Sequence, residues 1–163
     1  MRGSQRYCSS ASLACIQASV AASECEHTGQ IRVCIETHLP ASYLWRFLRQ
    51  GTPIIQLTRQ RAQMQFAKLR VWDTEHNNGV LIYLLLAERA IEVVADRGMT
   101  ANVTAAQWQA VIGSMQHAFK RSEFEVGLVL SVTAVTDLLK PHFPKTAQSQ
   151  IHLNELPDAP QLI

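Results

Sequence analysis

Two apolar segments joined by a short charged turn set the strongest limit on how this 163-residue chain can fold. The first, Gly79 to Leu86, is continuous (GVLIYLLL), which is typical of a strand covered on both faces. The second, Ile91 to Ala95, alternates around Glu92, and Ala87 to Ala90 form the expected turn between them. The pattern predicts a β-hairpin within a covered sheet.

Polar residues precede the first of these strands and follow the second. Because antiparallel strands reverse direction, the start of one strand and the end of the other lie at the same end of the sheet. We therefore expect carboxylate and amide groups from both segments to meet there. The candidate cation ligands are Asp73, Glu75, Asn77, Asn78 and Asp96, and the candidate anion ligand is Arg97.

Three interpretations of these residues remain open. Carboxylate and amide oxygens are the ligands that Ca²⁺ prefers, so the first is a divalent-cation site. The second adds Arg97, whose guanidinium can hold a phosphate through two parallel hydrogen bonds, and gives metal-assisted hydrolysis of a phosphomonoester. The third is structural, because Asp, Asn and Gly are also typical turn residues. No serine-nucleophile elbow, Cys–His signature or phosphate-binding loop identifies a nucleophile.

The composition fits one globular domain. Hydrophobic residues make up 47% of the chain and charged residues 17%, which is enough apolar material for a full core. The net charge of +2 is too small, and the basic residues are too scattered, for a nucleic-acid partner to be expected. We predict a flexible N-terminus over residues 1–10, a domain over 11–145 and an irregular C-terminal tail over 146–163.

Hydrophobic periodicity and capping signals predict the remaining elements. An N-terminal amphipathic helix precedes a strand over 31–36, and a helix over 53–69 crosses from that strand to the hairpin, a connection that normally joins parallel strands. Two later helices begin at the apparent capping boxes of Thr104 and Ser122. The order helix, strand, helix, strand, strand, helix, helix predicts a single-domain α/β/α sandwich with a small mixed sheet.

The cysteines and apolar segments exclude several other classes of protein. All four cysteines lie in the first quarter of the chain and none forms a C-x-x-C pair, so a disulfide scaffold is not indicated. Cys25, His27, Cys34 and His38 supply zinc-binding residue types, but their spacing matches no common structural-zinc pattern. No apolar run approaches the roughly 20 residues of a membrane-spanning helix.

Several motifs together resemble those of the TPM domain family. They are GQIRVCIE at 29–36, LRVWDTEHNNGVLIYLL at 69–85, IEVVADRG at 91–98, FKRSEFEVGL at 119–128 and NELPD at 154–158. The resemblance is closest to short bacterial members and extends from about residue 13 to residue 158.

The resemblance implies a mixed-sheet α/β/α sandwich. It also implies calcium binding or weak acid phosphatase activity, since both are credited to members of the family. The chain departs from the family pattern at 96–98, where it has Asp-Arg-Gly in place of a Gly-Tyr-Gly type sequence. The location expected is the bacterial cytoplasm or a membrane-associated position. Export is an alternative, because Arg2 and Arg6 precede a segment of small residues.

A binding or assembly module without chemistry is a further interpretation. Trp45 and Phe47 lie in a short helical segment, and Trp72 lies close to the polar cluster. Aromatic residues near chain turns either fill the core or mark a surface for a protein partner, such as a membrane protein or complex.

Overall fold

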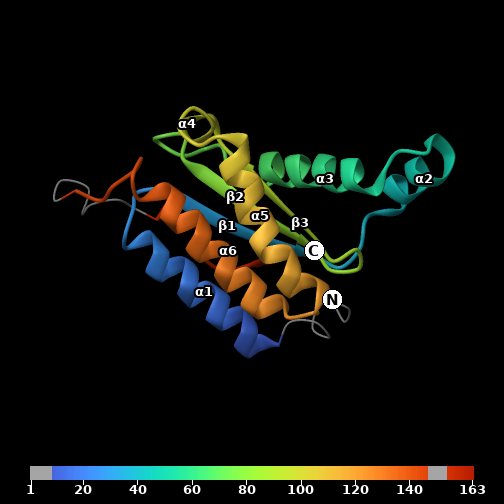
Figure 1. The fold of residues 1–163 in the computed structure, drawn as a ribbon, viewed down its shortest axis with the longest axis horizontal. Coiled ribbons are helices and arrows are strands. Elements are labelled where there is room, and N and C mark those ends of the chain that lie inside the picture. The colour runs from blue at the N-terminus through green and yellow to red at the C-terminus, as the bar shows by residue number, and fades with distance from the viewer. Residues whose placement is uncertain (1–8, 147–153) are drawn as a thin grey trace.

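The computed structural model describes residues 9–146 and 154–163 and shows a four-stranded mixed sheet between two layers of helices (Figure 1). The strand order is β3-β2-β1-β4. Strand β1 (Gln30–Glu36) pairs in parallel with β2 (Gly79–Leu85) and with β4 (Gln161–Leu162), and β2 pairs antiparallel with β3 (Ala90–Ala95). The predicted α/β sandwich with a small mixed sheet is confirmed.

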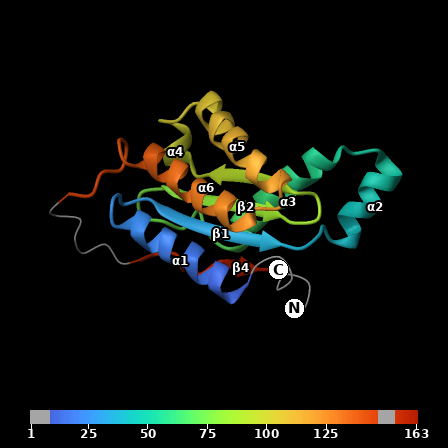
Figure 2. The same cartoon turned by 60° about the horizontal axis from the view of Figure 1, so that its bottom comes forward.

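The helices lie on both faces of this sheet. One face is covered by α1 (Ser10–Glu24), α5 (Ala105–Lys120) and α6 (Phe124–Leu139), and the opposite face by α3 (Ile54–Lys68), as the two views show (Figure 1, Figure 2). Helix α4 (Arg97–Thr100) is one turn that directly follows β3. Helix α2 (Ala41–Gln50) projects beyond the sheet, next to the start of α3. No helix among the described residues is long and apolar enough to cross a membrane.

The predicted hairpin is confirmed. Val80 lies opposite Ala95 and Leu85 opposite Ala90, and every residue of β2 is buried. The continuous apolar run of β2 is explained by its central position, because a strand between two others with helices on both faces exposes neither side. The crossover through α3 joins parallel strands, as expected.

The two faces of the sheet differ in polarity. Toward α1, α5 and α6 the buried polar groups are a few hydroxyls and the ring of His27, whereas toward α3 a carboxylate is buried among apolar residues. Glu36 accepts hydrogen bonds from Arg61 Nη2 at 2.6 Å and Nε at 2.8 Å, and from the Tyr83 hydroxyl at 2.7 Å. A buried carboxylate is stable only when its charge and lone pairs are satisfied in this way.

The prediction of an irregular tail is wrong for its last residues. Gln161–Leu162 pairs with Cys34 and Ile35 of β1 and adds a fourth strand to the sheet. The tail is held there by Arg32, a buried residue of β1 whose guanidinium donates to the backbone carbonyls of Pro157 and Ala159. Residues 1–8 of the predicted flexible N-terminus and residues 147–153 of the tail lie outside the described residues.

One of the two predicted capping boxes is wrong. Thr104 forms its box with Gln107, but helix α6 is preceded by Glu123, which makes no side-chain cap. Ser122 instead adopts a left-handed conformation, with φ of 63°, just after the end of α5. Only three residues separate the two helices, so Ser122 is used to end the first helix rather than to begin the second.

Candidate functional site

Four of the six polar residues predicted to meet at one end of the sheet come together there, namely Asn77, Asn78, Asp96 and Arg97. The start of β2 and the end of β3 are joined by three hydrogen bonds, from Asp96 N to Gly79 O at 2.9 Å, from Gly98 N to Asn77 O at 2.9 Å and from Arg97 Nε to Asn77 Oδ1 at 3.0 Å. We call residues 76–79 and 96–98 the loop cluster.

Two glycines allow the backbone segments of the loop cluster to lie this close. A Cβ atom on Gly79 would lie 1.9 Å from the carbonyl oxygen of Val71, and one on Gly98 would lie 2.5 Å from the carbonyl oxygen of Asn77. Both distances are far below van der Waals contact, and both neighbours are backbone atoms that cannot rotate away. Glycine is therefore required by packing at positions 79 and 98.

Asn78 and Asp96 each bury an oxygen atom that has no hydrogen-bond partner among the described residues. Asn78 is fully buried; its Nδ2 donates to Thr28 O at 3.0 Å, but its Oδ1 accepts nothing. Asp96 Oδ1 accepts the backbone N–H of Arg97 at 2.7 Å and caps α4, while Oδ2 is unpaired. Buried unpaired oxygens are costly, so these two atoms are the natural places for a cation or water to bind.

Asp73 and Glu75 lie on the exposed part of the same loop. The Asp73 side chain is 54% exposed, and one carboxylate oxygen is 3.8 Å from Arg70 Nε. Glu75 is also exposed, and its backbone N–H donates to Glu155 Oε2 at 2.9 Å. Among the described residues, no three His, Cys, Asp or Glu side chains are grouped so as to hold a metal ion. The structure thus gathers Asn77, Asn78, Asp96 and Arg97 and leaves the two other acids at the surface.

Glu155 belongs to this region, and sequence reasoning did not include it. Gln30 Oε1, at the start of β1, accepts the backbone N–H groups of Glu155 at 3.0 Å and of Leu156 at 3.1 Å. These bonds bring the tail beside the loop that carries Glu75. The available signal is the NELPD motif at 154–158, whose acidic residues lie in the segment predicted to be an irregular tail.

The cysteines and histidines considered for zinc do not assemble. Cys25 and His38 are exposed, whereas Cys34 is buried in β1, where burial raises the pKa of its thiol to about 12. A neutral buried thiol of this kind behaves as a small apolar side chain. The fourth residue, His27, has partners of a different type.

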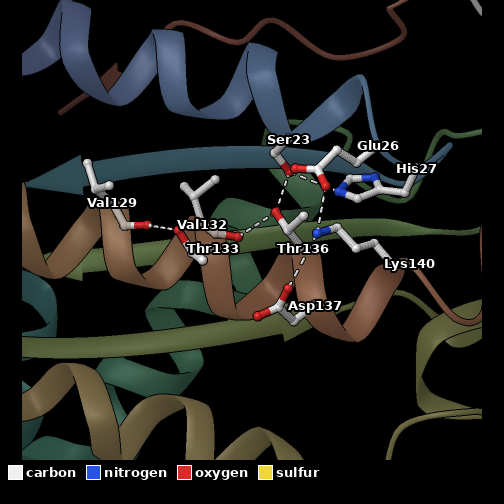
Figure 3. Close-up of polar contacts among 9 residues, drawn as sticks. All are labelled: Ser23, Glu26, His27, Val129, Val132, Thr133, Thr136, Asp137 and Lys140. Carbon is white, nitrogen blue, oxygen red and sulfur yellow. Dashed lines mark hydrogen bonds and ion pairs between the residues drawn. The ribbon is translucent and has the colours of Figure 1, made fainter.

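His27 takes part in a buried network of hydroxyl groups between α1 and α6 (Figure 3). Its Nε2 lies 2.9 Å from Ser23 Oγ, and its Nδ1 lies 3.1 Å from the carbonyl oxygen of Gly29. Ser23 Oγ in turn lies 2.5 Å from Thr136 Oγ1. Because a carbonyl can only accept, Nδ1 carries the proton. A neutral ring then requires Ser23 to donate to Nε2, while the Thr136 hydroxyl donates to the carbonyl oxygen of Val132 at 2.7 Å.

This network resembles a nucleophile and its base, but its surroundings are those of a structural contact. Ser23 and Thr136 are each 4% exposed and His27 is 1% exposed, so no substrate reaches the hydroxyl groups. The partner of Nδ1 is a backbone carbonyl rather than a carboxylate. The network therefore joins α1 to α6, and the exposed Glu26–Lys140 ion pair links the chain segments that follow these two helices (Figure 3).

Comparison with known families identifies the fold family. The family model described as TPM domain matches residues 6–138. The chain belongs to the TPM domain family. This confirms the resemblance seen in the motifs of the hairpin and the first strand.

Two solved structures show how far this TPM fold is shared. The NMR structure of the BA42 protein from the psychrophilic bacterium Bizionia argentinensis is similar with a TM-score of 0.78 and 22% identity, over 96% of this chain and 95% of that one. The N-terminal domain of the cg2496 protein from Corynebacterium glutamicum gives a TM-score of 0.53 and 14% identity, over 89% and 82% of the two chains. At these identities the likeness extends to the fold alone. No protein of curated function matches.

The protonation of His27 gives a prediction about stability. Burial lowers the pKa of His27 from 6.5 to about 4. The nearby charges of Lys140 and Lys145 also lower this pKa, whereas the charge of Glu26 raises it. The unfolded chain therefore binds a proton that the folded chain excludes, and stability falls as pH decreases from 6.5 toward 4, by up to about 1.4 kcal/mol per pH unit. Burial raises the pKa of Glu24 from 4.5 to about 7, which has the opposite effect over nearly the same range.

The effect of His27 is isolated in a Glu24→Gln background. Urea unfolding of Glu24→Gln and of Glu24→Gln/His27→Gln at pH 7 and pH 5 measures how much the free energy of unfolding of each variant changes with pH. We expect the chain that retains His27 to lose more stability on acidification than the double variant. Equal losses would contradict a neutral, buried His27.

Proposed function

We propose that this TPM domain binds a divalent cation, Ca²⁺ by its chemistry, at the loop cluster and serves as a binding or assembly module. The observation that carries the proposal is the pair of buried oxygen atoms, Asn78 Oδ1 and Asp96 Oδ2, that have no hydrogen-bond partner among the described residues. Both are hard oxygen ligands, one neutral and one anionic, of the kind that Ca²⁺ prefers.

Backbone groups of the loop cluster support the same chemistry. The carbonyl oxygens of His76 and Asn77 lie 2.9 Å and 2.5 Å from the position that a Gly98 Cβ would occupy, so any side chain at position 98 would crowd both of them. Carbonyl oxygens and water commonly complete a calcium shell of six to eight oxygens. Asp73 and Glu75 are proposed as additional ligands, because their exposed side chains are free of the packing that fixes Asn78.

Asp96→Asn tests the cation site directly. The amide oxygen can still cap α4, as the carboxylate does now, so the fold is expected to persist while the ligand charge is lost. We expect Ca²⁺ affinity, measured by calorimetry, to fall at least tenfold. Asp137→Asn is the control, because Asp137 is an exposed acid on α6 that pairs with Lys140 far from the loop cluster along the chain. Absence of binding by the unmodified protein up to millimolar Ca²⁺ would contradict the proposal.

Weak metal-assisted acid phosphatase activity is the second candidate function. It is favoured by Arg97, whose exposed guanidinium donates through Nε to Asn77 Oδ1 and lies next to the unpaired carboxylate oxygen of Asp96 in sequence. A bound divalent cation would supply an activated water molecule and offset phosphate charge. Arg97 would orient the phosphate through paired hydrogen bonds.

Hydrolysis of p-nitrophenyl phosphate in the presence of Ca²⁺ or Mg²⁺ measures this activity. We expect the activity to be lost in Asp73→Ala and in Asp96→Ala and kept in Asp137→Ala, with thermal unfolding used to confirm that all three variants are folded. Activity that persists in both loop variants would assign hydrolysis to another site or to a contaminant.

A further inference from the structure

Helix α2 carries large apolar side chains that nothing in the described part of the chain covers. No residue of α2 is buried, and Trp45 is 54% exposed, Phe47 45% and Leu48 78%. Ile55, at the start of α3, is 69% exposed. Both views show α2 projecting away from the sheet (Figure 1, Figure 2). Trp45 and Phe47 therefore do not fill the core.

The helix is amphipathic. Leu44, Phe47 and Leu48 follow the spacing of three and four residues that places side chains on one face. The rings of Tyr43 and Trp45 border this face, and two arginines on the opposite side of the helix stack on them. The guanidinium carbon of Arg49 lies 5.4 Å from the centre of the Trp45 ring, and that of Arg46 lies 5.7 Å from the centre of the Tyr43 ring. An exposed apolar face bordered by aromatic rings, with arginines on the polar side, is the pattern of a helix that lies in a membrane interface.

Charge is distributed unevenly around this helix. Residues 37–72 contain no Asp or Glu and carry six of the 15 Lys and Arg residues, so all 13 acidic residues lie elsewhere in the chain. Within that segment Arg59 pairs with Glu92, Arg61 with Glu36 and Arg70 with Asp73. Arg46 and Arg49 form no ion pair among the described residues. The helix that carries the apolar surface thus also carries two positive charges that no ion pair in the described part of the chain offsets.

We propose that α2 docks the protein onto an anionic lipid surface. A helix of 10 residues is about 15 Å long, too short to span a bilayer, so it would lie in the plane of the headgroups with Leu44, Phe47 and Leu48 inserted. Arg46 and Arg49 would contact lipid phosphates, and Trp45 would lie at the headgroup level, where aromatic residues are favoured. Pairing with a second copy is disfavoured, because it would bring the same arginines together.

Sedimentation of the full chain with vesicles tests this assignment. Vesicles of phosphatidylglycerol and phosphatidylcholine are compared with vesicles of phosphatidylcholine alone, in EDTA so that cation binding at the loop cluster has no part in the result. We expect binding to the anionic vesicles only. Leu44→Gln/Leu48→Gln should weaken it at least tenfold, and Arg46→Gln/Arg49→Gln by roughly 5-fold for each arginine.

Val126→Gln/Leu130→Gln is the matched control, because these residues of α6 are also exposed, by 53% and 48%. It should bind as the unmodified chain does. Absence of binding to anionic vesicles would overturn the proposal, as would equal binding by the Leu44→Gln/Leu48→Gln variant. A different result would assign the surface to a second copy instead. In that case the unmodified chain would bind no vesicles and would form a dimer without lipid, and the Leu44→Gln/Leu48→Gln variant would be monomeric.

Discussion

The close approach of the Val71 carbonyl to Gly79 is the constraint on which the loop cluster depends. No side chain fits at position 79, since even a Cβ atom would lie 1.9 Å from that oxygen. The loop therefore folds back against the start of β2 and buries Asn78 beside the chain that enters β1. The same approach places Asn77 against the turn after β3, where it accepts hydrogen bonds from Arg97 and Gly98.

The sheet makes this arrangement rigid enough to keep oxygen atoms unpaired. Strand β2 is buried along its whole length and is held by β1 on one side and β3 on the other. Its burial offsets the cost of leaving Asn78 Oδ1 and Asp96 Oδ2 without a hydrogen-bond partner in the described part of the chain. A ligand site built on the ends of such strands is more precisely positioned than one on a free loop. The α2 surface is different, because it lies on a projecting helix with few contacts to the body.

The pattern of apolar residues along the chain made much of the fold predictable. The continuous run of β2 and the alternation of β3 gave the hairpin, and the hairpin alone placed residues 77–78 beside residues 96–97. The burial of Asn78 was not predictable, because a polar residue before a glycine is equally typical of an exposed turn. Strand β4 has only two residues, too few to show any periodicity, so its pairing with β1 was missed.

The inward face of α6 could not be predicted from its sequence. Val126 and Leu130 are exposed, whereas Leu128 and Val132 are buried. The helix is apolar on nearly all sides, so its sequence has no polar face from which the orientation can be read. Its packing is instead set by contacts with α1 and α5, which only the tertiary structure supplies.

Backbone NMR during a Ca²⁺ titration tests the central claim, that the start of β2 and the end of β3 form one cation site, most directly. We expect the amide signals of residues 76–79 and 96–98 to shift together with a single saturation curve, while those of α2 stay unchanged. Shifts confined to one of the two segments, or spread over exposed acids throughout the chain, would contradict it.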